Sequence, residues 1–195
     1  MSFVFVSHAA ANKPEIRGLV EALLEADIPV WLDNPIAAGF SDEDLGKFAR
    51  IRAGARWEDE IDDALREASC ILVCWSKLAV TDSAFSGKER RTWLDEASYG
   101  RVEGKLVACR IDDVDPSLLP GTVSSQQIAN VSHSLSDDEW AASVAALIQD
   151  IVAKINADRS ANGRQSTMEK YIHSFTYYCG LDDSFIGFSR SNDGD

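Results

Sequence analysis

Residues 57–75 read WEDEIDDALREASCILVCW, and this stretch carries the pattern that decides the fold. In its first part, apolar side chains recur at the spacing of one helix face: Trp57, Ile61, Ala64, Leu65 and Ala68. The second part, SCILVCW at 69–75, is an almost continuous apolar run, as expected for a strand covered on both faces of a sheet. A helix that leads directly into a buried strand is the repeating unit of an α/β fold.

The same alternation continues on both sides of this stretch. Strands are expected at 3–7 (FVFVS), 29–33 (PVWLD), 105–112 (KLVACRID) and 126–131. Helical spacing is found at 12–24, 89–101 and 136–155, and a short helical stretch is expected at 42–48 inside a long loop, 34–56. Asn12 with Glu15, and Ser136 with Glu139, have the spacing of helix N-terminal capping boxes. The pattern predicts a flavodoxin-like, doubly wound, five-stranded parallel sheet with helices on both faces.

The length of 195 residues indicates one domain with a short appendage. We expect the domain to span 1–157. Residues 158–167 (DRSANGRQST) have the composition of a linker, and the rest of 158–195 is an aromatic-rich C-terminal tail of unknown role.

The charge balance excludes some classes of partner. A net charge of −13 argues against direct binding to nucleic acid backbones or to anionic membranes. No apolar run is long enough to cross a bilayer, and the start MSFVFVSHAA does not resemble a signal peptide. We therefore expect a cytoplasmic location.

The four cysteines do not form a metal-binding pattern. Cys70, Cys74 and Cys109 fall in predicted strands, where cysteine behaves as a small apolar residue. Together with Cys179 their spacing matches no zinc framework, so buried structural thiols are expected and no metal site is predicted.

Polar residues follow the predicted strands at the edge where ligands of open parallel sheets collect. They are Ser7 and His8 after the first strand, Asp33 after the second, Ser76 after the third and Asp112 after the fourth. On its own, His8 fits a loop residue better than a general base. A phosphotransfer receiver would need acids after the first strand and an Asp ending the third, and a dinucleotide-binding Rossmann unit would need G-x-G-x-x-G after the first strand; both patterns are absent.

Four segments resemble bacterial TIR (Toll/interleukin-1 receptor) domains of the NAD-hydrolase type. They are VFVSHAAANKP at 4–14, IPVWLD at 28–33, IRAGARWEDEIDDALREASCILVCWS at 51–76 and WLDEASYGRVEGKLVACRIDD at 93–113. The block at 51–76 is the most specific of the four, and the resemblance extends over roughly 1–157. The chain departs from the family in its long 35–49 segment and in placing Trp93 three residues before Glu96 rather than four.

The resemblance implies that Glu96 is the catalytic residue of an NAD⁺ glycohydrolase. It also implies that Ser7, His8, Asp33, Arg52 and Trp93 contact the substrate, and that Lys88, Arg90 and Arg91 either meet the pyrophosphate or form a solvated helix face. NAD⁺ is then a substrate, and no cofactor is needed. Members of this family commonly act in antiphage defence or signalling after self-association through TIR–TIR contacts, and release ADP-ribose or a cyclic isomer.

Two other functions remain open at this stage. The first is a non-catalytic TIR adaptor, although adaptors generally lack the glutamate that this chain carries at 96. The second is a nucleotide-processing relative, such as a deoxyribosyltransferase, which also uses a glutamate. Without the resemblance, Glu96 would be read as an ordinary solvated helix residue.

Overall fold

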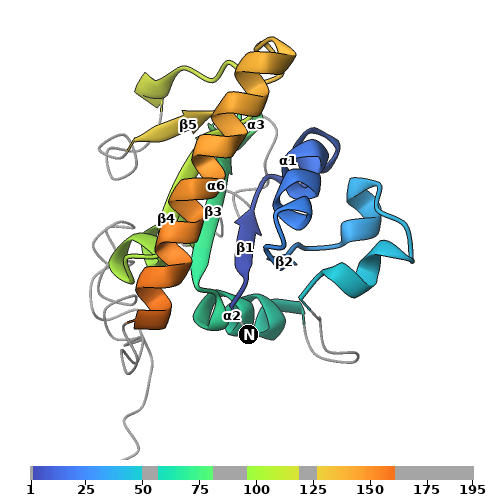
Figure 1. The fold of residues 1–195 in the computed structure, drawn as a ribbon, viewed down its shortest axis with the longest axis vertical. Helices are drawn as coiled ribbons and strands as arrows, with labels where there is room; N and C mark the ends of the chain where they lie inside the picture. The colour runs from blue at the N-terminus through green and yellow to red at the C-terminus, as the bar shows by residue number, and fades with distance from the viewer. Residues whose placement is uncertain (1, 50–56, 81–95, 119–126, 161–195) are drawn as a thin grey trace, which may run out of the picture.

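A computed structural model describes residues 2–49, 57–80, 96–118 and 127–160 (Figure 1). Five parallel strands form one sheet in the order β2-β1-β3-β4-β5. The strands are β1 (Val4–Ser7), β2 (Val30–Trp31), β3 (Cys70–Trp75), β4 (Leu106–Arg110) and β5 (Ile128–Asn130). The predicted five-stranded parallel α/β fold is therefore confirmed, with the chain reversing its direction of winding between β1 and β3.

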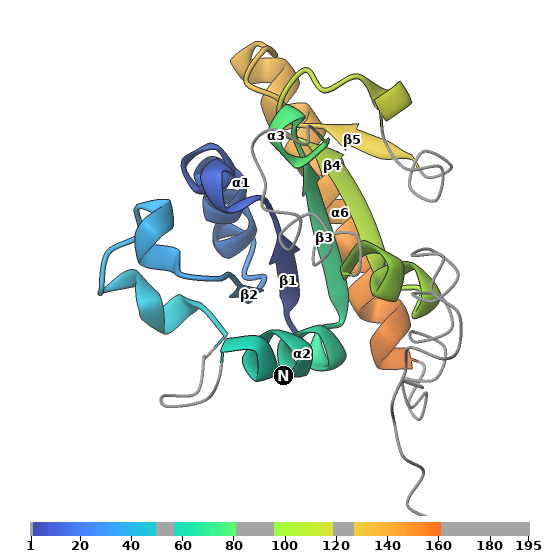
Figure 2. The same cartoon turned by 180° about the vertical axis from the view of Figure 1, so that it is seen from behind.

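Helices cover both faces of the sheet (Figures 1 and 2). The helices are α1 (Lys13–Glu25), α2 (Trp57–Glu67), the four-residue α3 (Lys77–Val80), a helix at 96–102 and α6 (Asp137–Ser160). Apolar residues of α1 and α6 pack on one face of the sheet, and apolar residues of α2, α3 and the 96–102 helix pack on the other. Within the described residues no helix is both long and apolar enough to cross a bilayer.

Strand alternation explains how β1 serves both cores. Val4 and Val6 join the cluster beneath α1 and α6, whereas Phe5 joins the cluster on the other face. Because successive side chains point to opposite faces, Ser7 shares the face of Phe5. The last residue of β1 therefore points toward the layer that contains the 96–102 helix.

The strand cysteines are buried, as expected. Cys70, Cys74 and Cys109 are free thiols with no exposed surface, and burial raises the pKa of Cys70 to about 12. Cys74 and Cys109 are register partners on β3 and β4, with their sulfur atoms 3.7 Å apart. Cys179 lies outside the described residues.

The second strand is shorter than expected because the chain leaves the sheet early. β2 contains only Val30 and Trp31, and two 3-10 helices follow at Pro35–Ala38 and Asp44–Lys47. The second of these lies where a short helical stretch was expected. The chain then returns to the sheet edge, where Phe48 forms a parallel bridge with Val30.

One capping prediction is confirmed and the other is wrong. At the start of α6, the Ser136 backbone N–H donates to the Glu139 carboxylate at 3.0 Å, and the Glu139 N–H donates back to Ser136 Oγ at 3.4 Å. At the start of α1, the Asn12 side chain makes no capping hydrogen bond. Its amide oxygen instead accepts a 2.6 Å hydrogen bond from Ser76 Oγ, so a contact far along the chain replaces the local one. The last helix continues to Ser160, three residues past the expected domain boundary, and the proposed tail lies outside the described residues from 161 onward.

Candidate active site

Ser7 and Glu96 meet at the carboxyl end of the sheet. The Ser7 hydroxyl donates a hydrogen bond to Oε2 of Glu96, joining two residues that are 89 positions apart in the sequence. Both are buried: Ser7 is 2% exposed and Glu96 is 8% exposed. A carboxylate loses most of its hydration in such a place and needs hydrogen-bond donors to remain there. The pair is therefore a defined feature of the fold, and Glu96 is not a solvated helix residue.

The helix that carries Glu96 lies close to the sheet because of Gly100. A β-carbon on Gly100 would come within 3.2 Å of Cβ of Ile71, on the central strand β3. Glycine is the residue that permits such a close approach between a helix and a strand. Since Gly100 is one helical turn after Glu96, it helps to set the depth at which the Glu96 carboxylate meets Ser7.

His8 continues the chain from Ser7 and is partly buried. Its Nδ1 lies 3.2 Å from the carbonyl oxygen of Val6, which can only accept a hydrogen bond, so Nδ1 carries a proton. Burial lowers the pKa of His8, and the charge of Lys13 lowers it further, while the Val6 carbonyl and Asp33 act in the opposite direction. His8 is therefore held toward its neutral form.

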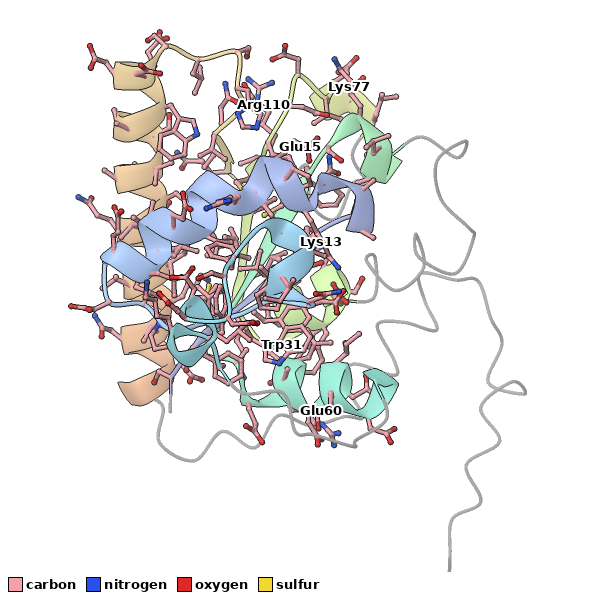
Figure 3. All side chains as sticks on the ribbon, turned by 90° about the vertical axis from the view of Figure 1, so that its right-hand side faces the viewer. Lys13, Glu15, Trp31, Glu60, Lys77 and Arg110 are labelled. Atoms are coloured by element: carbon pink, nitrogen blue, oxygen red, sulfur yellow. The ribbon has the colours of Figure 1, made fainter. Side chains whose placement is uncertain are left out.

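Lys13 is a site residue that the sequence analysis did not single out. It begins α1 (Figure 3). Its ammonium forms an ion pair with Asp33 at 3.0 Å. The Lys13 side chain is 11% exposed and that of Asp33 is 29% exposed. The only signal in the sequence is that Lys13 lies at the junction between the first strand and its helix, six residues after Ser7.

Other polar residues of this edge are engaged in structural hydrogen bonds. Ser76 Oγ donates to Asn12 and accepts from the Ala79 N–H, so it ties the loop after β1 to the loop after β3. The Asp112 carboxylate accepts from the backbone N–H groups of Lys77 and Val114. Neither Ser76 nor Asp112 presents its side chain primarily to a ligand.

The structure does not describe every predicted site residue. Arg52 and Trp93 lie outside the described residues, as do Lys88, Arg90 and Arg91. Among the residues that are described, no cluster of three or more His, Cys, Asp or Glu side chains could hold a metal ion. A cavity of about 770 Å³ between α2 and the segment after β2 is lined in part by Trp31, Phe48 and Glu60, and none of the predicted site residues that the structure describes lines it.

The arrangement has a clear chemical character. It combines a buried carboxylate oriented by a hydroxyl, a neutral imidazole, and an ammonium–carboxylate pair at the ligand-binding edge of an open sheet. A buried carboxylate at such a position can stabilise a cation that develops on a bound molecule.

Comparisons with known proteins agree with the fold. A solved structure described as a metazoan TIR-STING receptor from C. gigas in complex with 2',3'-cGAMP is similar at a TM-score of 0.50 and 16% identity. The match covers 78% of this chain but only 38% of that one, so the chain spans well under half the length of the receptor. A search of curated proteins gave no significant match. A family model described as "TIR domain" matches residues 4–148. That match includes β1, the Lys13–Asp33 pair, Glu96 and the first half of α6, and the chain belongs to the TIR domain family.

Proposed function

We propose that this TIR domain is an NAD⁺ glycohydrolase and that Glu96 is its catalytic residue. The observation that carries the proposal is the buried Glu96 carboxylate, which accepts a hydrogen bond from Ser7 at the carboxyl edge of the sheet. Carboxylates are rarely buried without hydrogen-bond partners, and titratable groups in unusual environments concentrate at functional sites. Glu96 is the buried carboxylate that also lies at the ligand-binding edge of the sheet.

The reaction breaks the bond between C1′ of the nicotinamide ribose and the pyridinium nitrogen. Both electrons of this bond leave with nicotinamide, which departs as a neutral molecule, so positive charge builds up on the ribose ring. The Glu96 carboxylate beside that ring stabilises this charge, by the same logic as the carboxylates of glycosidases. Water then adds to C1′ and releases a proton, giving ADP-ribose; attack by a nitrogen of the adenine gives a cyclic isomer instead.

In this proposal Ser7 orients the carboxylate of Glu96. Its hydroxyl donates a hydrogen bond to Oε2 of Glu96, which favours one orientation of the carboxylate before substrate binds. A preorganised charge stabilises a transition state without having to reorient during the reaction. His8 and Asp33 stay proposed substrate contacts, as do Arg52 and Trp93, and self-association is proposed to activate the enzyme as in related effectors.

The test compares two buried glutamates. Purified wild-type protein and the Glu96→Gln and Glu60→Gln variants are incubated with NAD⁺ over a range of protein concentrations, and released nicotinamide is measured by chromatography. Glu60 is 5% exposed and lies on α2, so its variant is an equally buried control. We expect Glu96→Gln to lose activity by roughly 100-fold or more, on the order of 3 kcal/mol of transition-state stabilisation, while Glu60→Gln keeps it.

Three outcomes contradict the proposal. Equal activity in wild type and Glu96→Gln would remove Glu96 from the mechanism. Absence of nicotinamide release from the wild type at every concentration, together with concentration-dependent self-association, would favour the adaptor function. Base exchange on deoxynucleosides without NAD⁺ cleavage would favour a deoxyribosyltransferase.

A further inference from the structure

The ammonium of Lys13 has hydrogen-bonding capacity that the fold does not use. A lysine ammonium carries three N–H donors, and among the described residues Lys13 Nζ makes one hydrogen bond, to Oδ2 of Asp33. Its side chain is only 11% exposed, so water can reach little of the group. A cation that is mostly removed from water and not fully hydrogen-bonded is costly unless a ligand completes its partners.

His8 has a second unused group on the same edge. Because Nδ1 holds its proton toward the Val6 carbonyl, the neutral ring presents Nε2 as an acceptor. Within the described residues Nε2 is buried and has no hydrogen-bond partner. His8 and Lys13 both belong to the short connection between the end of β1 at Ser7 and the start of α1, so the two unused groups lie on the same edge of the sheet. The charge of Lys13 also lowers the pKa of His8.

These two groups call for a ligand with a particular pair of features. The N–H donors of Lys13 fit oxygen atoms of an anion, and the acceptor on His8 fits a hydroxyl donor. A chain with a net charge of −13 repels anionic substrates in general, so a substrate with phosphate groups needs a local cation at its binding site. A ribosyl phosphate supplies both the phosphate oxygens and a hydroxyl within one small group.

We propose that Lys13 and His8 form a subsite for a ribosyl phosphate, in which the phosphate accepts from Lys13 Nζ and a ribose hydroxyl donates to His8 Nε2. This inference rests on the proposed function, because it places the phosphate next to the ribose that Glu96 serves. It makes Lys13 the residue that selects phosphorylated substrates over nucleosides. Asp33 holds the ammonium in place and shares it with the phosphate when substrate binds.

The experiment measures binding of two probes that differ by one phosphate. Nicotinamide mononucleotide carries the 5′-phosphate and nicotinamide riboside lacks it. Dissociation constants for both are measured by calorimetry on the Glu96→Gln protein, which prevents turnover, and then with Lys13→Met or Lys47→Met added. Lys47 forms an exposed ion pair with Asp44 at 2.8 Å and serves as the matched control.

We expect Glu96→Gln protein to bind the mononucleotide roughly 10- to 100-fold more tightly than the riboside, the range for one charge-assisted hydrogen bond. Lys13→Met should abolish this ratio, and Lys47→Met should leave it unchanged. His8→Asn keeps a donor for the Val6 carbonyl but removes the acceptor, so it should weaken both probes alike and preserve the ratio. Asp33→Asn should also preserve the ratio, because Lys13 remains.

Several results would overturn the inference. They are a Glu96→Gln protein that binds neither probe or shows no preference for the mononucleotide, a Lys13→Met variant that keeps the preference, and an Asp33→Asn variant that loses it as fully as Lys13→Met. The last result would mean that the ammonium of Lys13 alone does not supply the preference for the phosphate. Failure of the enzyme proposal is seen separately: wild-type protein would then leave NAD⁺ intact whatever the binding ratio.

Discussion

The face of the sheet beneath α1 and α6 and the face beneath α2 and the 96–102 helix are both covered by helices, yet they bury different side chains. The first face is filled by aliphatic and aromatic residues and cysteines. On the second, both buried acidic residues of the described chain, Glu60 and Glu96, lie on the covering helices. Burying a carboxylate costs stability that an apolar residue would not. We infer that the first face mainly stabilises the domain, whereas the second gives up some stability at Glu96 for the candidate site; Glu60, on α2, lies outside that site.

The largest effect on stability is expected on the first face. Leu147 of α6 is 1% exposed and belongs to the apolar cluster beneath α1 and α6. Leu147→Ala removes buried contacts and leaves a cavity, so it should lower the free energy of unfolding by about 2–5 kcal/mol. Urea denaturation measures the loss. NAD⁺ turnover per folded molecule should stay at the wild-type value, and a specific loss of turnover would break the division between the faces.

A smaller effect on stability, coupled to activity, is expected at Gly100. Gly100→Ala forces Ile71 or the 96–102 helix to move by a few tenths of an ångström, at a cost of about 1–3 kcal/mol. Because that helix carries Glu96, turnover should fall as well.

The matched variant is Gly18→Ala in α1, where the added carbon would lie 3.7 Å from the Trp140 ring, at ordinary contact distance. Gly18→Ala should stabilise the protein by roughly 0.5–1 kcal/mol and leave turnover unchanged. Thermal unfolding and nicotinamide release are measured on both variants. Equal changes in melting temperature and in turnover for the two variants would show that Gly100 does not position the helix that carries Glu96.

The smallest effect is expected on the pH dependence of protein stability, through His8 at the edge of the sheet where the candidate site lies. The pKa of His8 is lowered in the folded protein, mainly by burial, from the ordinary value of about 6.5 for histidine. The unfolded chain therefore binds more protons as pH falls below about 6.5, and stability must decrease in that range. Melting temperatures of wild type and His8→Asn, measured from about pH 8 to pH 5, should differ in slope, with the wild type losing more on acidification. Parallel curves of melting temperature against pH would contradict the lowered pKa of His8.

Local sequence patterns were sufficient to predict those elements that depend mainly on residues close together in the sequence. The apolar run at 69–75 became β3, and the Ser136–Glu139 capping box formed as predicted. Predictions were wrong where a distant residue competes with a near one. Asn12 is a residue type that commonly caps a helix, but its side-chain oxygen accepts a hydrogen bond from Ser76, 64 positions away. No local sequence pattern contains that information.

The residues of the candidate site also fall into two groups, those that could be predicted from local sequence and those that depend on distant contacts. Ser7 ends β1 and Asp33 lies two residues after β2, so their position on the ligand-binding edge could be predicted from topology. The meeting of Ser7 with Glu96 spans 89 positions, and Glu96 was singled out only through the family resemblance. Lys13 was missed because it reads as a solvated first-turn lysine, and its burial depends on a partner 20 positions away.

The buried thiols on β3 and β4 make the domain its own reporter of unfolding. Cys74 and Cys109 lie on adjacent central strands and expose no surface, so a thiol-specific reagent reaches them only when the sheet opens. Cys179 is replaced by serine so that only the strand cysteines react. When the sheet recloses faster than the reagent reacts, the labelling rate is proportional to the population of the opened state. Slower labelling in the presence of a nucleotide would then measure how strongly that ligand stabilises the native domain, without any enzymatic readout.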